Sequence, residues 1–300
     1  MGDYRGMKPS AFEYHRPETL EEALTVLAEL DGDGKVLAGG QSLVPMLNMR
    51  LAAPAHLVDI NRLSELARID VTPDAVTVGA IARHAEVEHS ADAERVLPLL
   101  RQALSHVAHP TIRNRGTTVG SIVHADPAGE MPSVLALLGG SVQLASVSGS
   151  RAVPVDDFFL APLESATRPG EVATSVTFPI PPPHTGTAWL EVSRRHGDYA
   201  MCGLGALVTL DEDLRISAAR ATYVSMGPTP VTVDFTELVG GRSYDAADWA
   251  AAARLVGSVV EPEEDIHATA EYRRHLAGVL TGRALKAAAA HAVARTEVAA

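Results

Sequence analysis

The sequence predicts a mixed fold of helices and strands in two domains, and three observations support this prediction. The chain has 300 residues, about twice the length of a typical single domain. Short apolar strands alternate with amphipathic helices along it, with no fixed repeat. A proline-rich segment at 179–183 is its clearest linker. We therefore expect one domain at 1–180 and a second at 181–300.

The first elements follow from the spacing of apolar residues. Residues 18–30 predict a helix, because Thr19 can cap its start and apolar side chains recur at helical spacing from Leu20 to Leu27. A run of aspartate and glycine at 31–34 ends this helix. Three further elements follow: a strand at 35–38, a helix or tight loop at 42–47 and a strand at 56–60.

The same alternation continues to the linker and beyond it. Before the linker we expect a strand at 75–78, a helix at 93–109 that Pro110 closes, a helix at 133–138 and a strand at 142–147. After it we expect strands at 206–210 and 218–224 and alanine-rich helices at 246–259 and 269–292.

Composition excludes several classes of protein. Apolar residues make up 46% and charged residues 21% of the chain, which is typical of a globular protein. The formal net charge of −12 argues against nucleic acid as a partner, since a general phosphate binder carries a basic face. Without a secretory signal or an apolar run of membrane-spanning length, we expect a cytoplasmic protein with no membrane span.

Two glycine-containing segments are candidates for binding a phosphorylated ligand. In the first, a strand leads through Gly39 and Gly40 to Ser42 and a helix, so the backbone can approach a phosphate closely. In the second, small, hydroxylated and cationic residues follow one another from Arg113 to Ser121. Each segment alone is also typical of an ordinary turn. Together they favour a large, phosphorylated ligand.

Other kinds of site lack a pattern in this sequence. Neither a P-loop nor a dinucleotide-binding G-x-G-x-x-G is present, and Gly203-Leu204-Gly205 precedes a strand instead of following one. The twelve histidines form no recognisable metal-ligand motif, so we predict no metal site. The single cysteine, Cys202, can form neither an internal disulfide nor a cysteine-ligated iron–sulfur cluster. No residue is assigned a catalytic role.

Taken together, the ordered motifs resemble a known family over nearly the whole chain. The segments 12–17, 38–45, 106–130, 194–200 and 272–285 match family positions in order. They are similar to the FAD-binding medium subunit of molybdenum hydroxylases, the carbon monoxide dehydrogenase and xanthine dehydrogenase group. This resemblance implies an α+β fold: a two-subdomain FAD-binding domain of the vanillyl-alcohol oxidase type, with subdomains at about 1–60 and 61–180, and a smaller C-terminal α+β domain.

The resemblance also implies which residues hold FAD. The first loop would cradle the pyrophosphate through its backbone, and the second would reach phosphate and ribityl groups. His124, Asp126, Thr167 and Tyr199 would lie toward the flavin. The implied cofactor-binding set is Ala38, Gly39, Gly40, Gln41, Ser42, Leu43, Gly116, Thr117, Thr118, Val119, Gly120, Ser121, His124, Asp126, Thr167 and Tyr199.

In such complexes the medium subunit relays electrons. A large subunit with a molybdopterin cofactor oxidises the substrate, and a small subunit with two [2Fe–2S] clusters passes electrons to FAD, which delivers them to an external acceptor. Two positions depart from the family pattern: Val119 stands where glycine is usual, and Thr167 where leucine is frequent. Two alternatives to this relay function remain open. The chain is a flavoprotein that acts alone on a small organic substrate, or it is a subunit that has lost FAD.

Overall fold

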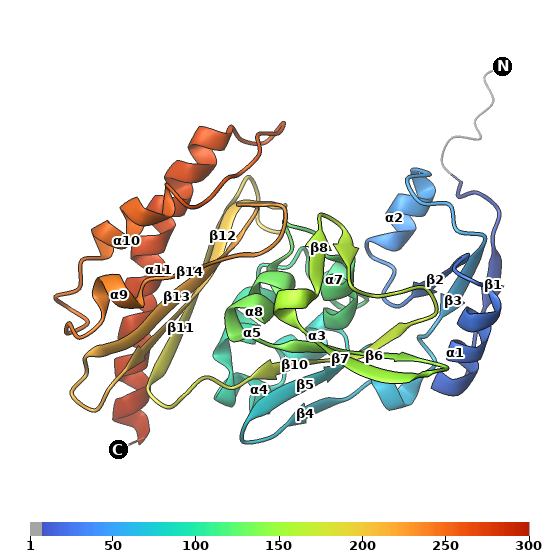
Figure 1. Ribbon diagram of the computed structural model, residues 1–300, viewed down its shortest axis with the longest axis horizontal. Helices are drawn as coiled ribbons and strands as arrows, with labels where there is room; N and C mark the ends of the chain where they lie inside the picture. Colours follow the sequence, from blue (N-terminus) through green and yellow to red (C-terminus); the bar gives the residue numbers. More distant parts are fainter. Residues whose placement is uncertain (1–7, 300) are drawn as a thin grey trace.

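Two hydrophobic cores organise the computed structural model, which describes residues 8–299, with side chains to residue 296 (Figure 1). The first core lies among the sheets and helices of the N-terminal 180 residues, and it also contains Trp189, Ala200, Leu207 and Val224. The second core lies between the C-terminal sheet and the C-terminal helices. The C-terminal sheet therefore contributes side chains to both cores.

The first sheet has three short parallel strands in the order β1-β3-β2. They are β1 (Glu13–His15), β3 (His56–Asp59) and β2 (Gly34–Leu37). The predicted helix is confirmed as α1 (Leu20–Glu29), and the Thr19 side chain accepts a hydrogen bond from the backbone N–H of Glu22. The ambiguous segment after β2 forms a helix, α2 (Leu43–Asn48).

The second sheet has five antiparallel strands in the order β4-β5-β10-β6-β7. They are β4 (Ile69–Val71), β5 (Ala75–Gly79), β10 (Val172–Pro179), β6 (Ser141–Ser146) and β7 (Gly149–Pro154). A small hairpin of β8 (Phe159–Ala161) and β9 (Glu164–Ser165) leads from β7 toward β10. One-turn 3₁₀ helices lie at Ser64–Leu66 and Val155–Asp157.

Six helices lie between β5 and β6: α3 (His84–Glu88), α4 (Ala91–Val96), α5 (Pro98–Leu104), α6 (Pro110–Arg113), α7 (Thr118–His124) and α8 (Glu130–Leu138). The prediction of one helix over 93–109 is wrong. Pro98 has no N–H to donate and excludes the helical conformation from Leu97, whose ψ is 69°. The chain then leaves the helix after Leu104, and Ala108 has a positive φ of 44°.

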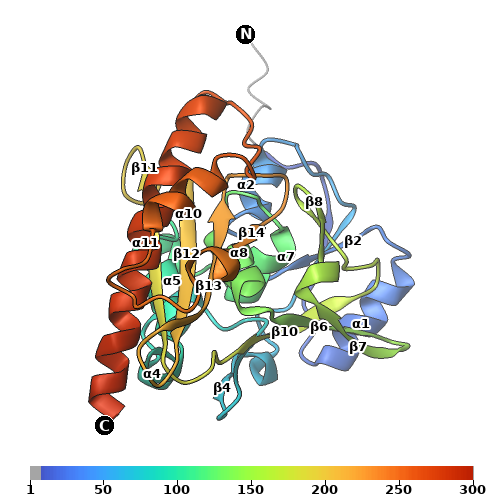
Figure 2. The same cartoon turned by 60° about the vertical axis from the view of Figure 1, so that its left-hand side comes forward.

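The C-terminal part is one antiparallel sheet with its own helices on one face (Figure 2), while α5 and α8 of the N-terminal part contact β11, β12 and β13. Its strands follow chain order: β11 (Thr185–Ser193), β12 (Ala200–Leu210), β13 (Ile216–Val224) and β14 (Val231–Asp234). The helices are α9 (Thr236–Val239), α10 (Trp249–Val256) and α11 (Ala270–Ala299). Over residues 8–299 no helix has both the length and the apolar character that crossing a membrane requires.

Alanine and glycine let α11 lie very close to β11. A Cβ added to Gly186 would lie 2.0 Å from the carbonyl oxygen of Ala288 and 2.2 Å from the backbone nitrogen of Ala292. The alanine-rich composition that predicts a helix therefore also sets the distance between this helix and the sheet.

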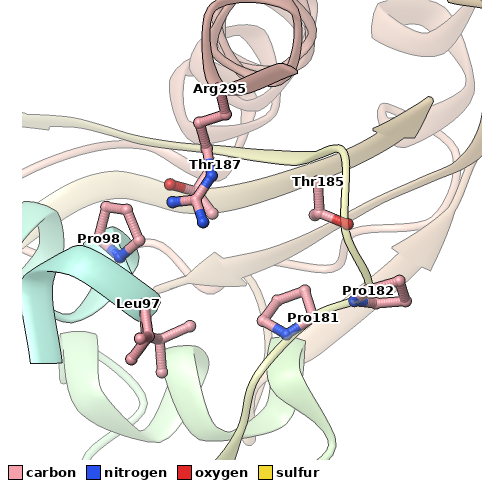
Figure 3. Close-up of a pocket in the computed structure, with 8 residues that line it drawn as sticks. Leu97, Pro98, Pro181, Pro182, Thr185, Thr187 and Arg295 are labelled. Atoms are coloured by element: carbon pink, nitrogen blue, oxygen red, sulfur yellow. The ribbon is translucent and has the colours of Figure 1, made fainter. Parts of the chain in front are cut away.

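The proline linker runs along the seam between the two parts of the chain. Pro181 and Pro182 line a shallow pocket there with Leu97 and Pro98 at the start of α5 and Arg295 near the end of α11 (Figure 3). Two segments distant in sequence, the start of α5 and the end of α11, thus meet at the linker.

Candidate functional site

The two glycine-containing loops lie directly against each other. A Cβ added to Gly39 would lie 2.4 Å from the carbonyl oxygen of Arg115 and 2.7 Å from the Cα of Gly116. Only glycine permits this approach, since both obstructing atoms belong to the backbone. The fold therefore brings together two segments that are more than seventy positions apart in the sequence.

The first loop presents unpaired backbone donors. Gly40 has a φ of +72°, and Gln41 Nε2 donates to the Gly39 carbonyl oxygen over 2.9 Å. Nowhere in the described chain does a group accept a hydrogen bond from the backbone N–H groups of residues 39–42. Successive free N–H groups beside a tight backbone contact suit an anionic group such as a pyrophosphate.

The remaining predicted residues of the first loop lie around these donors. Ala38 is half-buried, and its carbonyl oxygen is already bonded to a side chain. Ser42 is exposed at the start of α2 and makes no side-chain cap bond, so its hydroxyl is available to a ligand. Leu43, the first residue of α2, is half-buried.

Asn61 and Arg83 tie the two loops together, and sequence reasoning did not identify either of them. Asn61 Nδ2 donates to the Ala38 carbonyl oxygen over 2.7 Å. Arg83 Nη2 donates to Asn61 Oδ1 over 2.6 Å, and its Nη1 donates to the Arg115 carbonyl oxygen over 2.7 Å. The three bonds form a continuous connection from the first loop to the second. No local motif marks these residues, because the connection depends on the tertiary fold.

Internal hydrogen bonds hold the second loop in shape. Thr117 caps α7, and its Oγ1 accepts from the backbone N–H of Gly120 over 3.1 Å. Thr118 Oγ1 lies 3.2 Å from Nδ1 of the buried His84, whose backbone N–H donates to the Gly116 carbonyl oxygen. Burial, and then the nearby Arg113, lower the pKa of His84 to about 4, so this imidazole is neutral.

The two departures from the family pattern cause no strain. Val119 lies inside α7, is 2% exposed, belongs to the first hydrophobic core and lacks a positive φ. A β-branched side chain is therefore compatible with the backbone here. Thr167 is half-buried, and its Oγ1 accepts a hydrogen bond from Ser165 Oγ over 3.1 Å. Ser121 is half-buried on α7.

Asp126 and Tyr199 lie close together in the fold, although Asp126 precedes the proline linker in the sequence and Tyr199 follows it. The helix α7 ends at His124, and Ala125, its C-cap, has the left-handed conformation. Asp126 Oδ1 accepts a hydrogen bond from the backbone N–H of Ala128 over 2.8 Å. Partial burial of the hydroxyl and the adjacent Asp126 and Glu130 raise the pKa of Tyr199, although the residue as a whole is 67% exposed. Burial also lowers the pKa of the half-buried His124.

Two buried glutamates lie near this group. Glu130 begins α8, and burial followed by the charge of Glu191 raises its pKa to about 8. The side chain of Glu191 on β11 is 3% exposed, accepts from Trp189 Nε1 over 3.2 Å and has its pKa raised to about 7 by burial. Sequence reasoning identified neither as a site residue, because no local signal distinguishes a buried glutamate.

Three residues of β12 that the sequence brings to notice, Cys202, Gly203 and Gly205, contribute to packing and not to a binding site. Gly203 and Gly205 lie within this strand, and a Cβ added to Gly205 would meet Leu137 of α8 at 2.9 Å. Cys202 is fully buried, and burial raises its pKa to about 12, which keeps the thiol protonated and unreactive.

Two family models match consecutive parts of this chain. Residues 10–181 match the FAD binding domain in molybdopterin dehydrogenase. Residues 187–288 match the CO dehydrogenase flavoprotein C-terminal domain.

Named relatives cover almost the full chain. The alpha subunit of the 6-hydroxypseudooxynicotine dehydrogenase complex of Paenarthrobacter nicotinovorans is 40% identical over 280 residues, which are 93% of this chain and 95% of that protein. The carbon monoxide dehydrogenase medium chain of Hydrogenophaga pseudoflava is 35% identical over 288 residues, which are 94% and 98% of the two chains.

Solved structures of such proteins have the same fold. A chain of carbon monoxide dehydrogenase from Hydrogenophaga pseudoflava superposes with a TM-score of 0.89 at 34% identity, over 95% of this chain and 99% of that one. A chain of quinoline 2-oxidoreductase from Pseudomonas putida 86 gives the same TM-score at 35% identity and the same coverage.

Proposed function

The chain belongs to the family of FAD-binding medium subunits of molybdenum hydroxylases, and from this membership we propose that it relays electrons inside such a complex. As a member it binds FAD and is part of an oxidoreductase. The electrons come from [2Fe–2S] clusters on a small partner subunit, after a molybdopterin-containing large subunit has oxidised the substrate. They leave this chain for an external acceptor in the cytoplasm.

The structural observation that supports FAD binding at the two glycine-containing loops is their direct contact and their free backbone donors. The residues present fit FAD on two counts: the N–H groups of residues 39–42 have no acceptor in the described chain, and Gly39 leaves the second loop in direct contact. We assign the pyrophosphate to the first loop and further phosphate and ribityl contacts to residues 116–121. Asn61 and Arg83 are positioning residues, because they hold loop carbonyl groups.

Other side chains have supporting roles in this proposal. When bound, FAD supplies the ability to accept electrons singly and to pass them on. Asp126, Tyr199, His124 and Thr167 border the flavin side and limit access of water to it. Residues 1–180, with subdomains at about 1–60 and 61–180, form the FAD-binding domain, and residues 181–300 form the C-terminal domain.

Substitution of Gly40 by valine tests the loop assignment. A Cβ at this position would lie 3.2 Å from both Leu37 Cδ1 and Val44 Cγ2, and the φ of +72° disfavours any side chain. We expect FAD affinity to fall at least about tenfold, or by 1.4 kcal/mol, as measured by flavin content after purification and by titration of the flavin-free chain.

Gly241→Val is the matched control. Gly241 has the same φ of +72°, no neighbour within 4 Å of an added Cβ, and a position far along the chain from both loops. It should carry similar backbone strain and retain FAD. If Gly40→Val binds FAD as well as Gly241→Val does, our assignment of the first loop is wrong.

The relay is tested separately in the assembled complex. In the complex with its two partner subunits, substrate should reduce the flavin, whereas the isolated chain with FAD should not respond to it. Direct reduction of the isolated chain by a small organic substrate would instead support a flavoprotein that acts alone.

A further inference from the structure

Two histidines and one glutamate converge on one face of the first sheet. His15 Nε2 lies 3.0 Å from His56 Nδ1, and Glu13 Oε2 lies 3.7 Å from the same His56 nitrogen. The three potential ligand atoms all lie within 4.8 Å of one another. Figure 1 shows the two strands that carry them, β1 and β3, side by side.

Backbone register produces this convergence. Glu13 lies directly opposite His56 in the parallel pair β1–β3, and His15 follows Glu13 by two residues on the same strand. Side chains two apart on a strand lie on the same face. All three groups therefore share one face of the sheet, and the pairing of the strands fixes their separation.

We propose that Glu13, His15 and His56 form a binding site for a divalent transition-metal ion, of which Zn²⁺ is the representative. Imidazole nitrogens and a carboxylate oxygen are ligands that Zn²⁺ accepts at about 2.0–2.2 Å in a tetrahedral arrangement. Ligands at these bond lengths are separated by about 3.3 Å along a tetrahedral edge. The observed separations of 3.0 and 3.7 Å lie on either side of this value.

The electronic requirements of the site are also met. Each ring nitrogen in the cluster has a lone pair for the metal in the appropriate neutral tautomer, and the carboxylate offsets part of the ionic charge. Glu13 has a side chain that is 69% exposed, which leaves room for water as a fourth ligand. Without metal, the two imidazoles share one hydrogen bond, so the apo-site is compatible with folding.

A bound metal ion would crosslink the edge strand β1 to its neighbour β3. The strand β1 has three residues and pairs with β3 alone among the strands of its sheet. A metal ion bound to residues of both strands would connect them at a second point beside the ladder bonds. Glu13 and His56 begin their strands, whereas His15 ends β1, level with Val58 of β3 and Val36 of β2. None of the three belongs to the residues that we assign to FAD.

Calorimetric titration with Zn²⁺ tests the proposal on the full chain, prepared without a histidine tag and freed of metal with a chelator. We expect one ion per chain and a higher midpoint of thermal unfolding with Zn²⁺. Replacement of both His15 and His56 by alanine should weaken binding at least about tenfold and remove the thermal shift, and Glu13→Gln should weaken binding to a smaller extent.

His267→Ala is the matched control, because His267 is an exposed histidine on the loop before α11. It should retain both the Zn²⁺ affinity and the thermal shift, and flavin content should be the same in all variants. The proposal is overturned if the unaltered chain binds no stoichiometric ion, or if the double histidine variant binds Zn²⁺ with unchanged affinity. Circular dichroism establishes that each variant is folded.

Discussion

At the residue scale, Asn61 and Arg83 shape the proposed FAD site together with the glycines that the sequence marks. Their side chains join the carbonyl groups of Ala38 and Arg115, one from each loop. The glycines were identifiable because close backbone approach requires that residue type. Asn61 was not, because only the tertiary structure places an ordinary polar residue between two loops.

Asn61→Ala should weaken FAD binding at least about tenfold. The substitution removes the bond to Ala38 and leaves one terminal nitrogen of Arg83 without its partner, at a cost of about 1–3 kcal/mol in stability. Fluorescence titration of the flavin-free chain measures the affinity. Arg62→Ala is the control, because that neighbouring side chain forms only a surface ion pair with Glu18. Equal affinities in the two variants would contradict the positioning role of Asn61.

A second residue-scale prediction concerns pH. The pKa of Glu130 is about 8 in the folded chain and near 4.5 in the unfolded one. Between these two pH values Glu130 is protonated in the folded state and ionised in the unfolded state. The stability that Glu130 contributes is therefore fully present below about pH 4.5 and is lost as the pH rises through 8. Each such group contributes a slope of at most about 1.4 kcal/mol per pH unit. Glu191 acts in the same direction.

Glu130→Gln should therefore flatten the decline in unfolding free energy between about pH 5 and 8. Denaturant unfolding at several pH values measures this slope. Glu21→Gln is the control, because it removes an exposed carboxylate on α1. Its unfolding free energy should change with pH as steeply as that of the unaltered chain. A Glu130→Gln slope equal to that of Glu21→Gln would show that Glu130 ionises normally.

At the element scale, local patterns predicted part of the helices and strands and missed others, among them the long strands β10 and β11. Thr19 and the apolar spacing correctly predicted α1. The helix expected over 93–109 is divided at Pro98, since apolar periodicity continued across a residue that breaks the backbone ladder. The pairing of β5 with β10 joins segments about a hundred residues apart, and no local pattern contains that information.

The contact between α11 and β11 gives a prediction at this scale. Gly186→Ala should destabilise the chain by about 1–3 kcal/mol, because the added Cβ overlaps the helix backbone at Ala288 and Ala292. Gly257→Ala is the control, since its Cβ would make only an ordinary 3.5 Å contact. The two midpoints of thermal unfolding decide the matter: a value for Gly186→Ala as high as that for Gly257→Ala would mean that the helix moves away without cost.

At the scale of the whole molecule, the two parts of the chain depend on each other. Side chains from the C-terminal sheet, among them Trp189 and Leu207, complete the first hydrophobic core. Tyr199 meets Asp126 across the same seam. The proline linker was evident in the sequence, whereas this shared packing was not, because buried residues on both sides have the same apolar composition.

A fragment of residues 1–183 should consequently be less stable than the full chain and should bind FAD more weakly. Its first core would lose the buried side chains that β11, β12 and β13 provide, and each large one contributes about 1.5–3 kcal/mol. Size-exclusion chromatography and thermal unfolding compare the fragment with the full chain. A monomeric fragment with the unfolding midpoint of the full chain would contradict this interdependence.

The hydrogen-bonded connection through Asn61 and Arg83 also affects the conformational entropy that ligand binding costs. It holds the carbonyl groups of Ala38 and Arg115 before any ligand arrives, so the loops are preorganised. Binding that must first order a flexible segment loses part of its gross interaction energy to that ordering. At the proposed FAD site the loops are ordered during folding, so binding of the cofactor should lose little free energy to loop ordering.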